Sequence, residues 1–226
     1  MSDPRVLVLV LSADAGVYEQ MTEVIRATWG RGTRDDFRVI YYYGRRPHGP
    51  HPPQGGVVQE GDVMVADIPA GMYSILPETL MVYDHVRRTL PGYDYLYRCC
   101  AGSYLVRDEL LSWVRDKLRE RFYAGVHGAY GESTWHFASG SGYFLSRDLV
   151  DLIVDHAGQI LSYYPADHYM DDVAVGRFLA EQGVNPADAP RVDDSIVPQI
   201  GQYHYHLGAH PERMLALHQA LTGDRA

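Results

Sequence analysis

Residues 6–11 read Val6-Leu7-Val8-Leu9-Val10-Leu11, a continuous apolar run near the start of the chain. A strand with one solvated face alternates apolar and polar residues, so an uninterrupted run indicates a strand buried on both faces. Strands of this kind are typical of α/β folds, in which helices cover both faces of a mainly parallel sheet. The run therefore decides the fold class.

Predicted helices and strands alternate along the chain after this run, with a turn from Ser12 to Gly16. The further predicted strands are Val39–Tyr43, Val63–Ala66 and Tyr93–Cys99. The predicted helices are Tyr18–Thr28, Ile75 to Leu90, Arg107–Leu118, Arg147–His156, Asp171–Gln182 and Pro211–Leu221. The segment Gly125 to Gly142 is rich in Gly, Ser, His and aromatic residues and is expected to be irregular and to face substrate. With no repeat and no linker, the pattern predicts one α/β domain over residues 1–226.

Composition narrows the possible functions. The formal net charge of −9 disfavours a general nucleic-acid-binding surface, because phosphate contacts need a basic face. The two cysteines, Cys99 and Cys100, are adjacent and build no disulfide framework; they are interpreted as small buried residues at a strand end. Residues 6–11 are too short to span a bilayer and lack signal-peptide flanks, which predicts a cytoplasmic protein.

Ligands of open α/β sheets bind beyond the carboxyl ends of the strands. The loops that follow Leu11, Tyr43 and Arg98 are therefore expected to surround one crevice.

The order of motifs resembles that of the β-1,3-galactosyltransferase and Fringe-like glycosyltransferase family. The matching stretches are Ile25–Gly30 (Ile-Arg-Ala-Thr-Trp-Gly), Val39–Gly44, Asp62–Asp67 with Tyr73 and Leu76–Leu80, Ser139–Arg147 (Ser-Gly-Ser-Gly-Tyr-Phe-Leu-Ser-Arg) and Asp171–Gly176 (Asp-Asp-Val-Ala-Val-Gly). The resemblance implies a single-domain GT-A, Rossmann-like fold. It also implies an inverting hexosyl- or N-acetylhexosaminyltransferase that moves a sugar from a UDP-sugar to an acceptor hydroxyl.

The chain departs from this family at the metal site. The family places an Asp-x-Asp element, which holds Mn²⁺ or Mg²⁺, after the strand that corresponds to Tyr95–Arg98. Here the sequence is Arg98-Cys99-Cys100-Ala101-Gly102, and thiols are poor ligands for hard cations. The cofactor expectation stays open between no metal and Mn²⁺ or Mg²⁺ at a non-standard site. A catalytically inactive sugar- or nucleotide-binding module is the alternative function.

Glycosyl transfer needs a general base for the acceptor hydroxyl, and a carboxylate suits this task. Asp172 matches the Asp of the family motif and is the first candidate, with Asp171 next. Adjacent residues at a helix start point in different directions, so one aspartate is expected to cap the helix and the other to face the crevice. The alternative is a pair of capping or surface acids.

The remaining candidate residues divide by ligand. The donor-binding set is Ser12, Ala13, Arg26, Tyr43, Asp67, Arg98, Cys100 and Gly102; the acceptor- or sugar-binding set is Trp135, Ser139, Gly140 and Ser141; the metal- or diphosphate-binding pair is His204 and His206. Each assignment has a plain structural alternative: a turn residue for Ser12, a helix-surface charge for Arg26, a strand end for Asp67, core packing for Trp135 and a half-buried edge strand for the histidines. The acceptor class stays open among a glycan, a lipid-linked sugar, a small molecule, a protein and a modified base.

Overall fold

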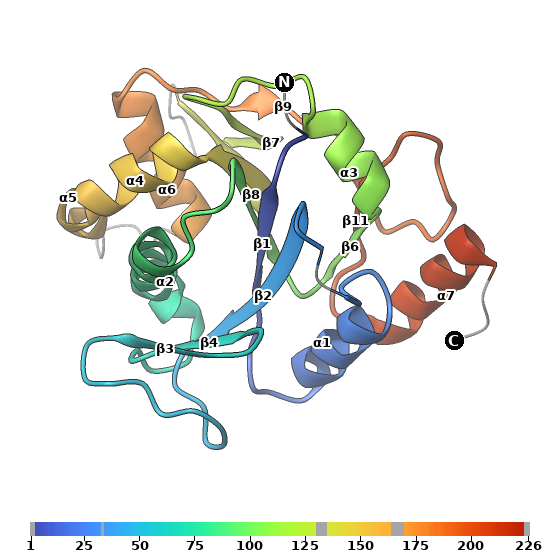
Figure 1. Cartoon of the computed structure of the whole chain (residues 1–226), viewed down its shortest axis with the longest axis horizontal. Helices are drawn as coiled ribbons and strands as arrows, with labels where there is room; N and C mark the ends of the chain where they lie inside the picture. Colours follow the sequence, from blue (N-terminus) through green and yellow to red (C-terminus); the bar gives the residue numbers. More distant parts are fainter. Residues whose placement is uncertain (1–2, 33, 130–134, 164–169, 224–226) are drawn as a thin grey trace.

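Strand β1 (Val6–Leu11) lies inside an eight-stranded sheet, as its continuous apolar sequence predicts (Figure 1). The computed structural model describes residues 3–32, 34–129, 135–163 and 170–223. On either side β1 pairs in parallel with β2 and β5, so that Val6 lies opposite Phe37 on one neighbour and Tyr95 on the other.

The sheet order is β3-β4-β2-β1-β5-β8-β7-β9. Its strands are β1, β2 (Phe37–Tyr43), β3 (Val57–Glu60), β4 (Val63–Ala66), β5 (Tyr95–Cys100), β7 (Tyr123–Ala129), β8 (His136–Ser146) and β9 (Ala187–Asp188). The four central strands β4, β2, β1 and β5 are parallel, while β3, β8 and β7 run antiparallel to a neighbour. The predicted α/β class with a mainly parallel central sheet and flanking helices is confirmed.

Helices cover both faces of this sheet (Figure 1). They are α1 (Val17–Ala27), a 3₁₀ turn η1 (Met72–Ser74), α2 (Ile75–Thr89), α3 (Arg107–Val114), α4 (Arg147–Asp155), α5 (Ala157–Ser162), α6 (Asp171–Glu181) and α7 (Pro211–Thr222). Val6, Val8 and Val10 pack into the core formed with α1, α3 and α7. Leu7 and Leu9 pack into the core formed with α2, α4, α5 and α6. The two cores explain why β1 has no polar residue.

A second sheet of three short strands extends the structure beyond β5, in the order β10 (Val192–Asp193), β11 (His204–His206), β6 (Ser103–Leu105). Strands β11 and β6 are antiparallel, with His206 opposite Ser103. This pairing brings a late histidine next to the chain that leaves the carboxyl end of β5.

The expectation of an irregular segment from Gly125 to Gly142 is wrong for the described part of it. Residues 123–129 and 136–146 form the antiparallel pair β7 and β8; residues 130–134 lie outside the described part of the chain. The glycines serve close packing inside the sheet. A Cβ atom on Gly125 would lie 2.6 Å from the Cβ of Ala138, and one on Gly142 would lie 2.6 Å from the Cε1 of His204. The glycine content therefore suggested a loop, whereas these strand positions need glycine because neighbouring atoms leave no room for a side chain.

Within the described residues, no helix combines the length and the apolar character needed to cross a membrane.

Candidate active site

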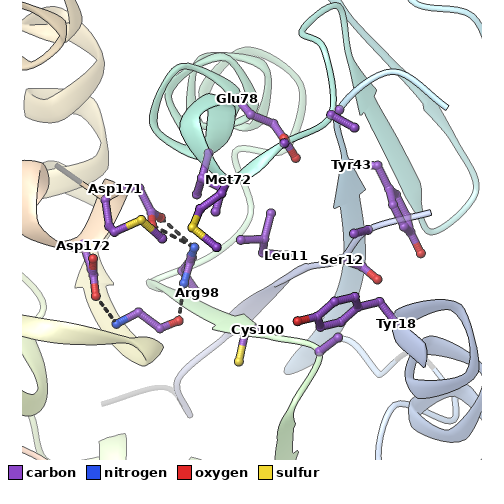
Figure 2. A pocket seen from close by; sticks show the side chains of 18 of the residues that line it. Leu11, Ser12, Tyr18, Tyr43, Met72, Glu78, Arg98, Cys100, Asp171 and Asp172 are labelled. Atoms are coloured by element: carbon purple, nitrogen blue, oxygen red, sulfur yellow. Dashed lines mark hydrogen bonds and ion pairs between the residues drawn. The ribbon is translucent and has the colours of Figure 1, made fainter. Parts of the chain in front are cut away.

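A cavity of about 520 Å³ opens at the carboxyl ends of β1, β2 and β5, where the sheet geometry predicts a crevice (Figure 2). Its size lies within the usual range of small-molecule sites. Segments from η1, α2, β8 and the start of α6 complete its wall. The predicted site residues that line it are Ser12, Ala13, Tyr43, Arg98, Cys100, Ser139, Gly140, Ser141, Asp171, Asp172 and His206.

Arg98 and Asp171 form a buried ion pair at one end of the cavity (Figure 2). Their nearest nitrogen and oxygen atoms are 2.8 Å apart, and both side chains are at most 3% exposed. The guanidinium also donates to the Tyr42 hydroxyl at 3.1 Å and to the carbonyl of Gly140. Arg98 therefore has a compensated charge and a full set of partners. Arg98 was predicted to bind the donor. In the structure its hydrogen bonds instead hold Asp171 in position.

Asp172 points away from Asp171 and contacts strand β8. One carboxylate oxygen accepts a hydrogen bond from the Gly140 amide at 2.6 Å, and the other accepts one from the Val173 amide at 2.9 Å. Burial, followed by the charge of Asp171, raises the pKa of Asp172 to about 6, against the opposing effects of Arg98 and these two amides. A carboxylate that is largely ionised at pH 7 and has a pKa this near to neutrality suits general base catalysis.

The expectation that one aspartate caps α6 holds only in part. The N-cap residue is Met170, whose side chain makes no capping hydrogen bond, while Asp172 accepts a hydrogen bond from the Val173 amide in the first turn. Asp171 is drawn to Arg98 because a buried guanidinium needs a compensating charge, and Thr79 also donates to its carboxylate at 3.3 Å. The other part of the expectation, that the two carboxylates diverge, is confirmed.

Glu78 is an acidic residue in the cavity that sequence reasoning missed. It projects from α2 into the cavity, between Asp171 and Tyr43 in the view of Figure 2, and is 3% exposed. Its Oε1 atom is buried and has no hydrogen-bond partner among the described residues. Burial, with a smaller contribution from Asp171, raises the pKa of Glu78 to about 8, so the carboxyl group is mostly neutral at pH 7.

The other end of the cavity is basic and aromatic. Arg46 donates to Asp14 at 2.9 Å and lies over the ring of Tyr43, with its Cζ 4.3 Å from the ring centroid. Its Nε is buried without a partner in the described part of the chain. Arg45 also lines the cavity, pairs with Asp67 at 2.7 Å and is exposed. Neither arginine is among the predicted site residues, because both belong to a segment rich in Pro, Gly and His.

Cys100 and His206 occupy the place where the resemblance leads us to look for the metal site. Burial acts to raise the pKa of Cys100, but the hydrogen bond and charge of His206 outweigh it, and the pKa is lowered. The interaction with Cys100 raises the pKa of His206, whose Nδ1 lies 3.6 Å from an Asp193 oxygen. Each partner therefore shifts the other toward its charged form.

These side chains do not make a fitting Mn²⁺ or Mg²⁺ site. Hard divalent cations need several oxygen ligands, whereas this position offers a thiol and an imidazole. No group of three His, Cys, Asp or Glu side chains within the described ranges could hold a metal ion.

Five predicted site residues lie outside the cavity: Arg26, Asp67, Gly102, Trp135 and His204. Arg26 makes two hydrogen bonds with Asp62 and lies over the ring of Tyr41. Asp67 accepts hydrogen bonds from Arg45 and from the Gly55 amide, so it organises the loop between them. Arg26 lies on α1 and Asp67 directly follows β4, and each side chain is held by an ion pair.

The other three are excluded by packing. His204 is 1% exposed, its Nδ1 lies 3.0 Å from the Tyr97 hydroxyl, and burial lowers its pKa well below the usual value, so it is neutral. Gly102 lies against the backbone of Gly208, where a Cβ would approach its carbonyl oxygen to 2.8 Å. Trp135 packs at the edge of the core formed with α2 and α6, beside Phe137.

Comparison with known proteins identifies the fold. No protein-family model matches the chain, and no curated protein sequence does. The structure matches the crystal structure of a glycosyltransferase involved in the glycosylation of the major capsid of PBCV-1, with a TM-score of 0.56 and 10% sequence identity. The match covers 95% of this chain and 98% of that chain. The chain therefore has a glycosyltransferase fold of the GT-A-like kind, while membership of the β-1,3-galactosyltransferase and Fringe-like family stays a prediction.

Proposed function

We propose that this protein is a glycosyltransferase that moves a hexosyl or N-acetylhexosaminyl group from a UDP-sugar to an acceptor hydroxyl, with inversion. The observation that carries the proposal is Asp172. It is a cavity carboxylate with a pKa of about 6, held by a backbone amide at the carboxyl edge of the sheet in a glycosyltransferase fold. Fold alone does not decide function, so the proposal rests on this site.

The basic end of the cavity suits the nucleoside diphosphate. Arg46 lines the cavity with its side chain 20% exposed, and Arg45 adds a second cation at the rim. Hydrogen bonds from guanidinium groups to phosphate are among the strongest in proteins. Tyr18 and Tyr43 line the same end and offer rings to the base, and Ser12 lies between them (Figure 2). Ala13 also lines the cavity. These cations take over the charge compensation that a metal supplies in related enzymes.

The acidic end suits the acceptor. Asp172 takes the proton of the acceptor hydroxyl while the acceptor oxygen bonds to the anomeric carbon of the sugar. The bond from that carbon to the diphosphate oxygen breaks, and its electron pair leaves with the nucleoside diphosphate. Asp172 and Tyr43 lie at opposite sides of the cavity in Figure 2. Attack from the side opposite to the leaving group inverts the anomeric centre. Ser139 and Ser141, which line the wall beside Gly140, are the proposed acceptor contacts.

The test begins with calorimetric titration of the protein with UDP, UDP-glucose, UDP-galactose and UDP-N-acetylglucosamine, with Mn²⁺ and again with EDTA. We expect binding that survives EDTA. UDP release, with water or a panel of sugar alcohols as acceptor, measures turnover. No binding of any of these compounds under either condition contradicts the proposal.

Asp172→Asn separates turnover from binding. We expect UDP release to fall by a factor of about 10²–10⁴, the usual contribution of a general base, with UDP-sugar affinity nearly unchanged. Because the base must be ionised, wild-type turnover should fall as the pH drops below about 6, the pKa of Asp172. The matched control is Asp108→Asn, whose side chain is 87% exposed on α3 and should leave turnover unchanged. Binding by the wild type without UDP release at any pH favours the non-catalytic binding module.

A further inference from the structure

Glu78 has no role in the proposed reaction, yet its position in the cavity is central. In Figure 2 its carboxyl group lies between the aspartate end and the tyrosine end. If the diphosphate lies by Arg46 and the acceptor by Asp172, the transferred sugar fills the space between them. Glu78 then faces the sugar.

The carboxyl group of Glu78 has an unpaired oxygen among the described residues. Its Oε1 is buried and makes no hydrogen bond to any of them. Arg98, the cation whose charge acts on Glu78, is engaged by Asp171, Tyr42 and the Gly140 carbonyl. An unpaired buried carboxyl group costs free energy, and a ligand hydroxyl that hydrogen-bonds Glu78 where it lines the cavity recovers part of that cost.

Burial, more than the surrounding charges, keeps the carboxyl group of Glu78 neutral. Asp171 on α6 raises its pKa and Arg98 on β5 lowers it, and the Tyr42 hydroxyl on β2 accepts a hydrogen bond from Arg98. Asp171, Asp172 and Glu78 are three carboxyl groups that interact with the charge of Arg98. Burial and the charge of Asp171 keep Glu78 protonated at pH 7. The cluster then carries a net charge of about −1, from two carboxylates and one guanidinium.

We propose that Glu78 is a specificity-determining residue that uses its buried carboxylic acid group to hydrogen-bond a hydroxyl of the transferred sugar. This inference rests on the proposed function. A neutral carboxyl group both donates and accepts, which matches a hydroxyl. A sugar that carries a carboxylate at this place meets Asp171 and Asp172 and is repelled. The site therefore selects sugars with a free hydroxyl over the corresponding uronic acids.

The experiment compares UDP, UDP-glucose and UDP-glucuronic acid by calorimetry at pH 7 with wild type, Glu78→Gln and Glu78→Leu. For the wild type we expect UDP-glucose to bind at least about tenfold more tightly than UDP-glucuronic acid, which corresponds to 1.4 kcal/mol. Glu78→Gln should keep UDP-glucose affinity because the amide also donates and accepts. Glu78→Leu should lose about tenfold for UDP-glucose and nothing for UDP, which lacks the sugar. Glu60→Gln, at the exposed end of β3, is the matched control.

Raising the pH supplies a second measurement that needs no destabilising variant. Wild-type affinity for UDP-glucose should fall as the pH rises above about 8, where Glu78 loses its proton, while Glu78→Gln should show no such fall. Equal binding of the two sugars by the wild type, or identical behaviour of all variants, overturns this inference while UDP binding leaves the proposed donor site intact. Failure of the wild type to bind even UDP overturns the proposed function and this inference with it.

Discussion

At the acidic end of the cavity, the guanidinium of Arg98 is almost fully buried and each of its nitrogen atoms has a partner. At the basic end, the side chain of Arg46 is 20% exposed, lines the cavity and rests on Tyr43, and its buried Nε has no partner among the described residues. The same residue type thus serves two purposes. A buried, fully paired arginine holds other groups in place, and a partly exposed arginine in the cavity wall can contact a ligand.

The largest expected effect comes from breaking the paired arginine. Arg98→Met leaves Asp171 as an uncompensated buried charge, so the free energy of unfolding should fall by about 3–5 kcal/mol. The matched control is Arg26→Met. Its ion pair with Asp62 is 40–48% exposed, and its loss should cost at most about 1 kcal/mol. Urea denaturation measures both values, and similar costs for the two variants would mean that the buried pair does not organise the site.

A smaller effect is expected from the partly exposed arginine. Arg46→Gln should weaken UDP binding about tenfold and make the affinity less dependent on salt, because it removes a charge from the phosphate contact. Arg45→Gln removes a charge that is more exposed and already paired with Asp67, so we expect UDP affinity to fall only about two- to threefold. Calorimetry at two salt concentrations checks both. An unchanged affinity for Arg46→Gln would move the diphosphate to another part of the cavity.

The smallest effect concerns the alkylation rates of the neighbouring cysteines. Protection of Cys100 by a ligand would show how far that ligand extends from the basic end. Cys100 lines the cavity and has a lowered pKa, whereas Cys99 is fully buried and burial raises its pKa well above the usual value. Iodoacetamide at pH 7 should therefore alkylate Cys100 at least about tenfold faster than Cys99, because the thiolate is the reacting form. Peptide mass spectrometry measures the ratio. UDP-sugar should slow the reaction of Cys100 more than UDP does, and preferential labelling of Cys99 would contradict the site geometry.

Much of the fold follows from local pattern. The limits of β1, β4 and the start of α6 agree with the sequence predictions, and the three strand-end loops do surround one cavity. Asp171 and Asp172 were chosen from their match to the family motif, and the structure places both at the start of α6 in the wall of the cavity. Strands β7 and β8 were missed because their glycines imitate a loop.

The site was predicted less completely, since its decisive features are contacts between distant segments. Nothing local distinguishes Glu78 from an ordinary solvated glutamate; only the packing of α2 against the sheet buries it. Arg46 belongs to a Pro- and Gly-rich segment that resembles an exposed loop, and its contacts with Asp14 and Tyr43 bring it inward. Arg26 and His204 show the opposite error. Both were predicted to belong to the site, but neither side chain lines the cavity.

By itself, the sequence determined the α/β class, the order of the main elements and the edge of the sheet at which a ligand binds, because apolar periodicity and turn chemistry act over a few residues. Only the tertiary structure decided which carboxyl groups are ionised and which arginine side chains can contact a ligand. Those properties depend on burial and on partners far apart in the sequence, such as Thr79 and Asp171, which are 92 residues apart. No local sequence pattern encodes the burial that gives Asp172 and Glu78 different pKa values. Nor does one encode the packing that encloses Arg98 and leaves Arg46 partly exposed.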